Sequence, residues 1–104
     1  MKKLILILLS IVALYAKSSV DCIILEDENS IVCKYTHTRI AHDHNITVNW
    51  IEPVGFISRT RTLKIPAYHG SVYDYRYIKG RTKGLWTFEV VDDGKSYRTH
   101  FELK

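Results

Sequence analysis

Apolar and polar residues alternate with a period of two along most of the chain after residue 20. Ile46, Val48 and Trp50 share one face of an extended segment, whereas Thr47 and Asn49 share the other. The same alternation recurs in two later segments. One face of the first carries Trp86, Phe88 and Val90, and one face of the second carries Tyr97, Thr99, Phe101 and Leu103. No stretch keeps helical periodicity beyond one turn, so the pattern predicts an all-β protein.

The pattern predicts seven strands separated by turn residues. Two apolar runs flank the polar "EDEN" at 26–29, and the other five segments span 46–51, 57–65, 71–78, 85–91 and 96–103. Gly, Pro, Asn and Asp mark the intervening turns at 52–55, 65–70, 79–84 and 92–94. Seven short strands, each with one apolar face, predict an antiparallel β-sandwich.

The first residues have the order of a secretory signal peptide. Lys2 and Lys3 precede a short apolar run, and small Ala16 precedes a polar segment. A membrane anchor is the alternative, but a spanning helix needs about 20 apolar residues and this run is shorter. We expect cleavage after Ala16, which leaves one domain, residues 17–104, exported to the bacterial periplasm or beyond and not embedded in the membrane.

Removal of the signal peptide changes the charge balance. Loss of Lys2 and Lys3 lowers the number of basic residues from 15 to 13 against 11 acidic ones, a net charge of +2. So small an excess argues against nucleic acid as a partner.

Cys22 and Cys33 lie on either side of the first predicted turn. With Asp27 and Glu28 at the tip, Ile24 pairs with Ile31 and the two cysteines oppose each other. Directly opposed residues have Cβ atoms about 4.5–5.5 Å apart, close enough for a disulfide after small adjustments. An exported chain favours that bond, and it would add roughly 3 kcal/mol to the stability of a small domain.

The runs "VNWIEPVG" (48–55) and "GLWTFEVVDDGKSYRTHFEL" (84–103) carry a family resemblance. Residues 46–104 resemble small immunoglobulin-like domains of secreted bacterial proteins, in which a similar Gly-x-Trp run and an Asp-Gly turn form the last hairpin. The resemblance implies a seven-stranded immunoglobulin-like sandwich with Trp50 buried. A disulfide within the first hairpin departs from the antibody pattern, which links the two sheets.

Signals of catalysis are absent from the sequence. There is no Gly-x-Ser-x-Gly, no glycine-rich phosphate loop and no Cys-x-x-Cys, and nothing places a nucleophile beside a base. We therefore expect no enzyme activity and no cofactor.

The segment "YDYRY" places Tyr73, Tyr75 and Tyr77 on one strand face, with Asp74 and Arg76 on the other. The first interpretation packs the rings inside the domain, with their hydroxyls at the rim. The second makes them a solvent-facing strip for sugar rings or a peptide, with a cationic loop beside it that carries Lys79, Arg81 and Lys83. Arg59 and Arg61 alternate with threonines, a pattern typical of a charged edge strand.

The segment "AHDHNIT" (41–47) has two candidate functions. His42 and His44, with His37 upstream, offer imidazoles for a metal, but a structural zinc site needs four ligands, so we expect none. Asn45 begins an Asn-x-Thr acceptor sequence, and Asp43 extends it to the bacterial glycosylation pattern. A plain turn asparagine is the alternative.

These observations predict a non-catalytic exported binding module that recognises a protein or an envelope polysaccharide. A structural accessory subunit of an envelope or secretion complex is the alternative. The candidate ligand-binding residues are Tyr73, Tyr75, Tyr77, Lys79, Arg81 and Lys83.

Overall fold

The computed structural model describes residues 18–104. The predicted signal peptide, residues 1–16, lies outside this range. The described residues form seven strands and one short 3-10 helix, which confirms the all-β prediction. The elements are β1 (Ser19–Leu25), η1 (Glu26–Glu28), β2 (Ser30–Thr36), β3 (His44–Ile51), β4 (Ile57–Ile65), β5 (Ser71–Tyr77), β6 (Gly84–Asp92) and β7 (Lys95–Leu103).

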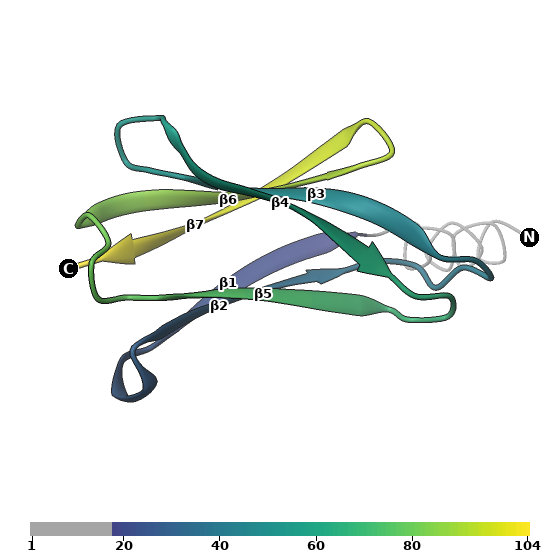
Figure 1. Cartoon of the computed structure of the whole chain (residues 1–104), viewed down its shortest axis with the longest axis horizontal. Helices are drawn as coiled ribbons and strands as arrows, with labels where there is room; N and C mark the ends of the chain where they lie inside the picture. Colours follow the sequence, from purple (N-terminus) through teal and green to yellow (C-terminus); the bar gives the residue numbers. More distant parts are fainter. Residues whose placement is uncertain (1–17) are drawn as a thin grey trace, which may run out of the picture.

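The strands form two antiparallel sheets that face each other as a β-sandwich (Figure 1). One sheet has the order β1-β2-β5 and the other the order β4-β3-β6-β7. Along one side of the sandwich β1 lies close to β7, whereas on the other side β4 and β5 approach each other at only a few positions. The side between β4 and β5 is therefore the more open one.

The apolar faces predicted by alternation meet in the core between the sheets. Trp50 on β3 is fully buried and packs edge-on against Phe88 and Phe101, with ring centroids 4.9 and 5.9 Å away. Such edge-to-face contacts add to the stabilisation from burial alone. The other large buried side chains include Trp86, Tyr35, Ile31, Ile46 and Val90.

The first hairpin has the register and the disulfide that the sequence predicts. Ile24 lies opposite Ile31 and Cys22 opposite Cys33, whose Cα atoms are 4.0 Å apart and whose sulfurs are bonded. Asn29 closes the turn in the left-handed conformation, which asparagine tolerates well. Both cysteines belong to adjacent strands of one sheet, so the bond joins β1 to β2 and does not link the sheets.

Most predicted strand boundaries lie within one residue of the observed ones, and the start of the third strand differs by two. The third strand begins at His44, not at residue 46, because His44 and Asn45 pair with Ile65 and Lys64 of β4. Asn45 is thus exposed within a regular strand and does not lie in a loop before it.

Candidate functional site

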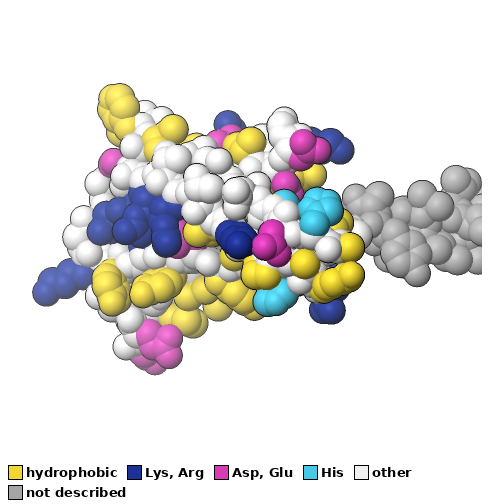
Figure 2. All heavy atoms as spheres, turned by 45° about the vertical axis from the view of Figure 1, so that its right-hand side comes forward, with side chains coloured by type: hydrophobic (Ala, Val, Ile, Leu, Met, Phe, Trp, Pro, Cys, Tyr) yellow, Lys and Arg dark blue, Asp and Glu magenta, His cyan; other side chains and the backbone are white. Residues whose placement is uncertain are grey.

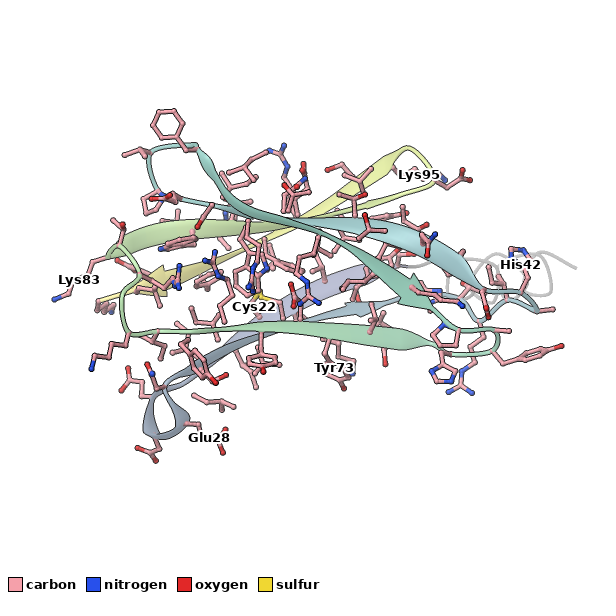
Figure 3. The ribbon with its side chains drawn as sticks, viewed as in Figure 1. Cys22, Glu28, His42, Tyr73, Lys83 and Lys95 are labelled. Carbon is pink, nitrogen blue, oxygen red and sulfur yellow. A yellow bond between two sulfur atoms is a disulfide. The ribbon has the colours of Figure 1, made fainter. Side chains whose placement is uncertain are left out.

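The three tyrosines of β5 face solvent, so the interpretation that packs their rings inside the domain is wrong. Tyr73, Tyr75 and Tyr77 are 57%, 55% and 58% exposed. Figure 3 shows Tyr73 pointing away from the sandwich. The inward positions of this strand hold Asp74 and Arg76 instead.

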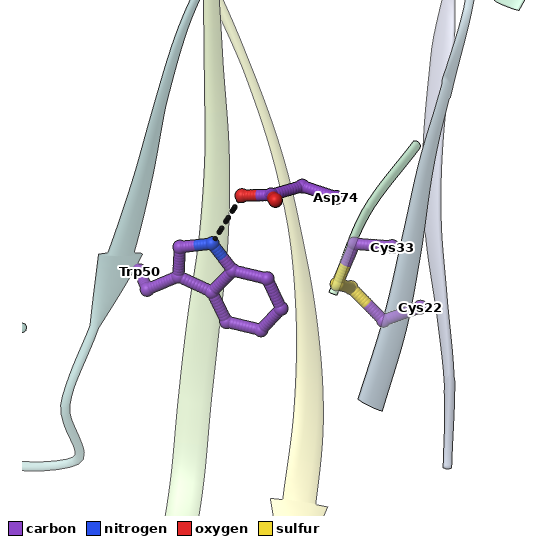
Figure 4. Close-up of a disulfide and its surroundings, with 4 residues drawn as sticks. All are labelled: Cys22, Cys33, Trp50 and Asp74. Atoms are coloured by element: carbon purple, nitrogen blue, oxygen red, sulfur yellow. Dashed lines mark hydrogen bonds between the residues drawn. A yellow bond between two sulfur atoms is a disulfide. The ribbon is translucent and has the colours of Figure 1, made fainter. Parts of the chain in front are cut away.

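Asp74 faces inward because two donors from the opposite sheet satisfy its carboxylate. The indole Nε1 of Trp50 donates a hydrogen bond of 2.9 Å to Oδ2 (Figure 4), and Nη1 of Arg61 donates one of 2.6 Å to Oδ1. A buried carboxylate is stable only when it is paired and hydrogen-bonded in this way. Asp74 therefore connects β5 to both β3 and β4.

Arg76 is the second inward side chain and is also buried. Its Nη1 donates a hydrogen bond of 2.9 Å to Oγ of Ser58, and its guanidinium lies 5.7 Å from the ring centroid of Trp50. A guanidinium tolerates such a position because its flat faces are weakly hydrated and stack on aromatic rings.

Arg76 is buried near two other arginines and two carboxylates. Burial lowers the pKa of Arg76 below its ordinary value, and the charges of Arg81 and Arg59 lower it further. Asp74 and Glu52 act in the opposite direction. Burial and the neighbouring arginines therefore act together against the charge of Arg76.

These arginines line a cleft at the open side of the sandwich. Its volume is about 220 Å³, and its walls are Arg59, Arg61, Tyr75, Arg76, Tyr77 and Arg81. Arg59 and Arg61 come from β4 in one sheet, whereas Tyr75, Arg76 and Tyr77 come from β5 in the other. Figure 2 shows basic side chains gathered in one patch with hydrophobic side chains along its border. We call this site the arginine cleft.

The loop after β5 fixes the last wall of the arginine cleft. The backbone N–H of Arg81 donates to the carbonyl of Ile78, and its side-chain Nε donates to the carbonyl of Tyr77 at 3.3 Å. Asn29 holds the start of this loop, because its side-chain oxygen accepts a hydrogen bond from the N–H of Lys79.

The exposed tyrosines extend from the arginine cleft across the outer face of the β1-β2-β5 sheet. Tyr75 lies 6.2 Å from Tyr77, ring centroid to centroid, and opposite Val32 of β2. Lys34 places its ammonium 5.8 Å from the ring centroid of Tyr73. We call Tyr73, Tyr75 and Tyr77 the tyrosine strip.

The structure brings together only part of the predicted binding set. Tyr75, Tyr77 and Arg81 line the arginine cleft, whereas Tyr73 continues the strip, and exposed Lys79 and Lys83 are not among the lining residues. Sequence reasoning missed Arg59, Arg61 and Arg76 as site residues. The sequence signal for them is the density of arginines in the neighbouring segments 57–65 and 71–78, where the alternation itself predicts only a charged edge strand and the face opposite the tyrosines.

The arrangement suits an anion. Arginine presents a planar fork of N–H donors that matches carboxylate, phosphate and sulfate oxygens, and four guanidinium groups converge here. An anion bound there would be attracted by Arg59 and Arg81, whose charges disfavour that of Arg76.

In residues 18–104, no group of three or more His, Cys, Asp or Glu side chains is arranged to hold a metal ion. That part of the chain also contains no helix long and apolar enough to span a membrane. Comparison with protein-family models, with curated proteins and with solved structures gave no match.

Proposed function

We propose that this protein is a non-catalytic, exported module that binds an acidic polysaccharide of the cell envelope. The observation that carries the proposal is the continuity of the arginine cleft with the tyrosine strip through Tyr75 and Tyr77. Aromatic rings stack on the apolar faces of sugars, while the guanidinium groups pair with carboxylate, phosphate or sulfate substituents.

The size of the arginine cleft favours a polymer as the ligand. Pockets for complete small molecules have volumes of roughly 300–1,000 Å³, and this cleft, at about 220 Å³, is smaller. It suits one charged substituent of a longer chain, whose neighbouring sugars would lie on the exposed tyrosines.

The finer fold and the compartment belong to the same proposal. Seven antiparallel strands in two sheets and a buried Trp50 on the third strand support an immunoglobulin-like sandwich. The disulfide between Cys22 and Cys33 supports an oxidising compartment, such as the bacterial periplasm or cell surface. Cleavage of the signal peptide after Ala16 would be checked by N-terminal sequencing of the exported protein.

Glycosylation of Asn45 remains a separate proposal. The exposed side chain is reachable, but pairing of Asn45 with Lys64 holds the acceptor backbone in a strand. Intact mass spectrometry of protein from the native host tests it, since Asn45→Gln should abolish any added mass.

Binding to polysaccharide can be tested by affinity electrophoresis in gels that contain polygalacturonate, dextran sulfate or neutral dextran. We expect retardation by at least one acidic polymer and not by neutral dextran. Arg59→Ala and Tyr75→Ala should each weaken that binding about tenfold or more, with a loss of affinity at high salt. Equal mobility in all three gels would contradict the proposal.

The chain supplies matched controls for these variants. Lys95 lies at the tip of the β6–β7 hairpin, far from the arginine cleft (Figure 3), and Tyr68 is 66% exposed in the β4–β5 connection. Lys95→Ala removes one positive charge and Tyr68→Ala removes one exposed ring. Both should bind the acidic polymer within about twofold of the unchanged protein.

A second candidate function, a structural accessory subunit, is favoured by the exposed apolar turn between β3 and β4. Val54 and Phe56 are each 73% exposed, and large apolar side chains at such positions often mark protein contacts. Loss of co-purifying envelope proteins in Phe56→Ser, with polysaccharide binding absent throughout, would favour this function.

A further inference from the structure

A second cavity lies at the opposite end of the sandwich from the arginine cleft. Its volume is about 660 Å³, and its lining includes His37, His42, His44 and Asp92. Figure 3 labels His42 at this end of the molecule. The proposed polysaccharide site does not use these residues.

The ring of His37 is held in place by its neighbours, and one of its two nitrogens has no hydrogen-bond partner. It is 9% exposed and stacks on Tyr35, with ring centroids 5.5 Å apart. Its Nδ1 lies 2.8 Å from the carbonyl oxygen of Thr38, which can only accept, so Nδ1 carries the proton. In the neutral ring Nε2 then holds a lone pair, and this buried atom has no hydrogen-bond partner.

His44 repeats this arrangement with the two nitrogens exchanged. Its Nε2 lies 3.6 Å from Oδ2 of Asp92. The same oxygen accepts a hydrogen bond of 2.8 Å from the Tyr35 hydroxyl. The carboxylate favours the proton on Nε2, so Nδ1 holds the lone pair. Nδ1 is likewise buried and has no hydrogen-bond partner.

The two rings have a separation that suits a shared metal ion. Their centroids lie 4.9 Å apart and their planes are inclined by 82°. A metal about 2.0 Å from one nitrogen of each ring, with a tetrahedral angle, would hold the centroids about 5 Å apart. Histidine ligands of metals often donate their other N–H to a carbonyl or a carboxylate. The carbonyl of Thr38 takes that role for His37, and the carboxylate of Asp92 lies 3.6 Å from Nε2 of His44, beyond hydrogen-bond distance but close enough to act as its charged neighbour.

In place of the sequence-based expectation of no metal at these histidines, we propose that Nε2 of His37 and Nδ1 of His44 are the two protein ligands of a divalent transition-metal site. Imidazole ligands suit copper and zinc, and the general order of divalent affinities places Cu²⁺ above Zn²⁺. Both histidines line the cavity, and no third protein ligand is arranged for a metal within residues 18–104. A small ligand or a group of a binding partner would complete the coordination of the metal.

His42 provides a matched control. It lines the same cavity and stands two residues from His44, but it is exposed, and its Nδ1 lies 3.1 Å from the carbonyl oxygen of Asp43. A metal bound by any accessible histidine would depend on His42 as much as on the proposed pair.

The test is calorimetric titration of the disulfide-bonded protein with Cu²⁺ and with Zn²⁺. We expect one ion per chain and tighter binding of Cu²⁺. His37→Phe, which keeps a ring to stack on Tyr35, and His44→Phe should each weaken binding about tenfold or more. His42→Ala should bind within about twofold of the unchanged protein. No binding tighter than about 100 µM, or equal binding by all variants, would overturn the proposal.

A second measurement keeps the test decisive if a phenylalanine variant folds poorly. In the unchanged protein, Zn²⁺ should shift the ¹⁵N resonances of His37 Nε2 and His44 Nδ1 and leave those of His42 in place. Shifts confined to other histidines would rule out the proposed ligand pair.

Discussion

The indole of Trp50 on β3 donates a 2.9 Å hydrogen bond to the carboxylate of Asp74 on β5, across the interface between the two sheets. The same carboxylate accepts from Arg61 on β4. Asp74 thus determines which face of β5 points inward and places Arg61 in the wall of the arginine cleft. One buried side chain links the core of the fold to the proposed binding site.

Asp74→Ala should destabilise the protein by about 3 kcal/mol, because it leaves the buried Trp50 N–H without an acceptor and removes the partner of Arg61. Asp74→Asn retains one acceptor and should cost less, about 1–2 kcal/mol. Urea unfolding measures both. Asp21→Ala, at an exposed position in the same sheet, controls for loss of charge and should change the free energy of unfolding by less than about 0.5 kcal/mol.

The disulfide between Cys22 and Cys33 closes a loop with a sequence separation of 11 residues. Replacement of both cysteines by serine should lower the free energy of unfolding by about 3 kcal/mol, because the unfolded chain regains the conformations that the bond removes. Denaturant unfolding of the double variant measures the loss. An unchanged midpoint would mean that pairing of β1 with β2 is independent of the bond.

Glu89 should make stability depend on acid pH. The hydrogen bond from Asn49 is the largest cause of its lowered pKa, and Arg98 and Ser96 lower it further. Its contribution is therefore complete above the ordinary carboxyl value of 4.5 and is lost as the pH falls through the lower, folded-state pKa.

The pH dependence can be measured by urea unfolding of the unchanged protein and of Glu89→Gln between pH 7 and pH 3. The variant should be less stable at pH 7 and should lose less stability on acidification. Glu102→Gln removes one charge from an exposed position of β7 and controls for net charge. Parallel pH profiles for the unchanged protein and Glu89→Gln would show that Glu89 carries none of the dependence.

Gly84 has a conformation and a neighbour that exclude a side chain. Its φ is +129°, and an added Cβ would lie 2.9 Å from Cγ of Pro53. Gly84→Ala should cost about 2–3 kcal/mol, through backbone strain and this contact. Gly80 has a φ of +87° with open space around it, so Gly80→Ala should cost only about 1 kcal/mol. Thermal unfolding compares them, and equal losses would exclude a role for Pro53.

Sequence alone determined the features of this protein that depend on neighbours along the chain. Alternation placed Trp50, Trp86 and Phe88 in the core, because successive strand residues point to opposite faces and β3 and β6 each carry one mainly apolar face. The polar turn at 26–29 set the register that opposes Cys22 and Cys33, because a hairpin pairs residues symmetrically about its tip.

Tertiary structure alone decided the orientation of β5 and the composition of the arginine cleft. Both faces of "YDYRY" carry side chains with polar groups, so its alternation does not identify the inward face. Asp74 is satisfied by Trp50 and Arg61, which are 24 and 13 residues away in the chain. The cleft likewise combines β4 of one sheet with β5 of the other. Partners so distant in sequence leave no local periodicity, and they meet only because the sheets pack face to face.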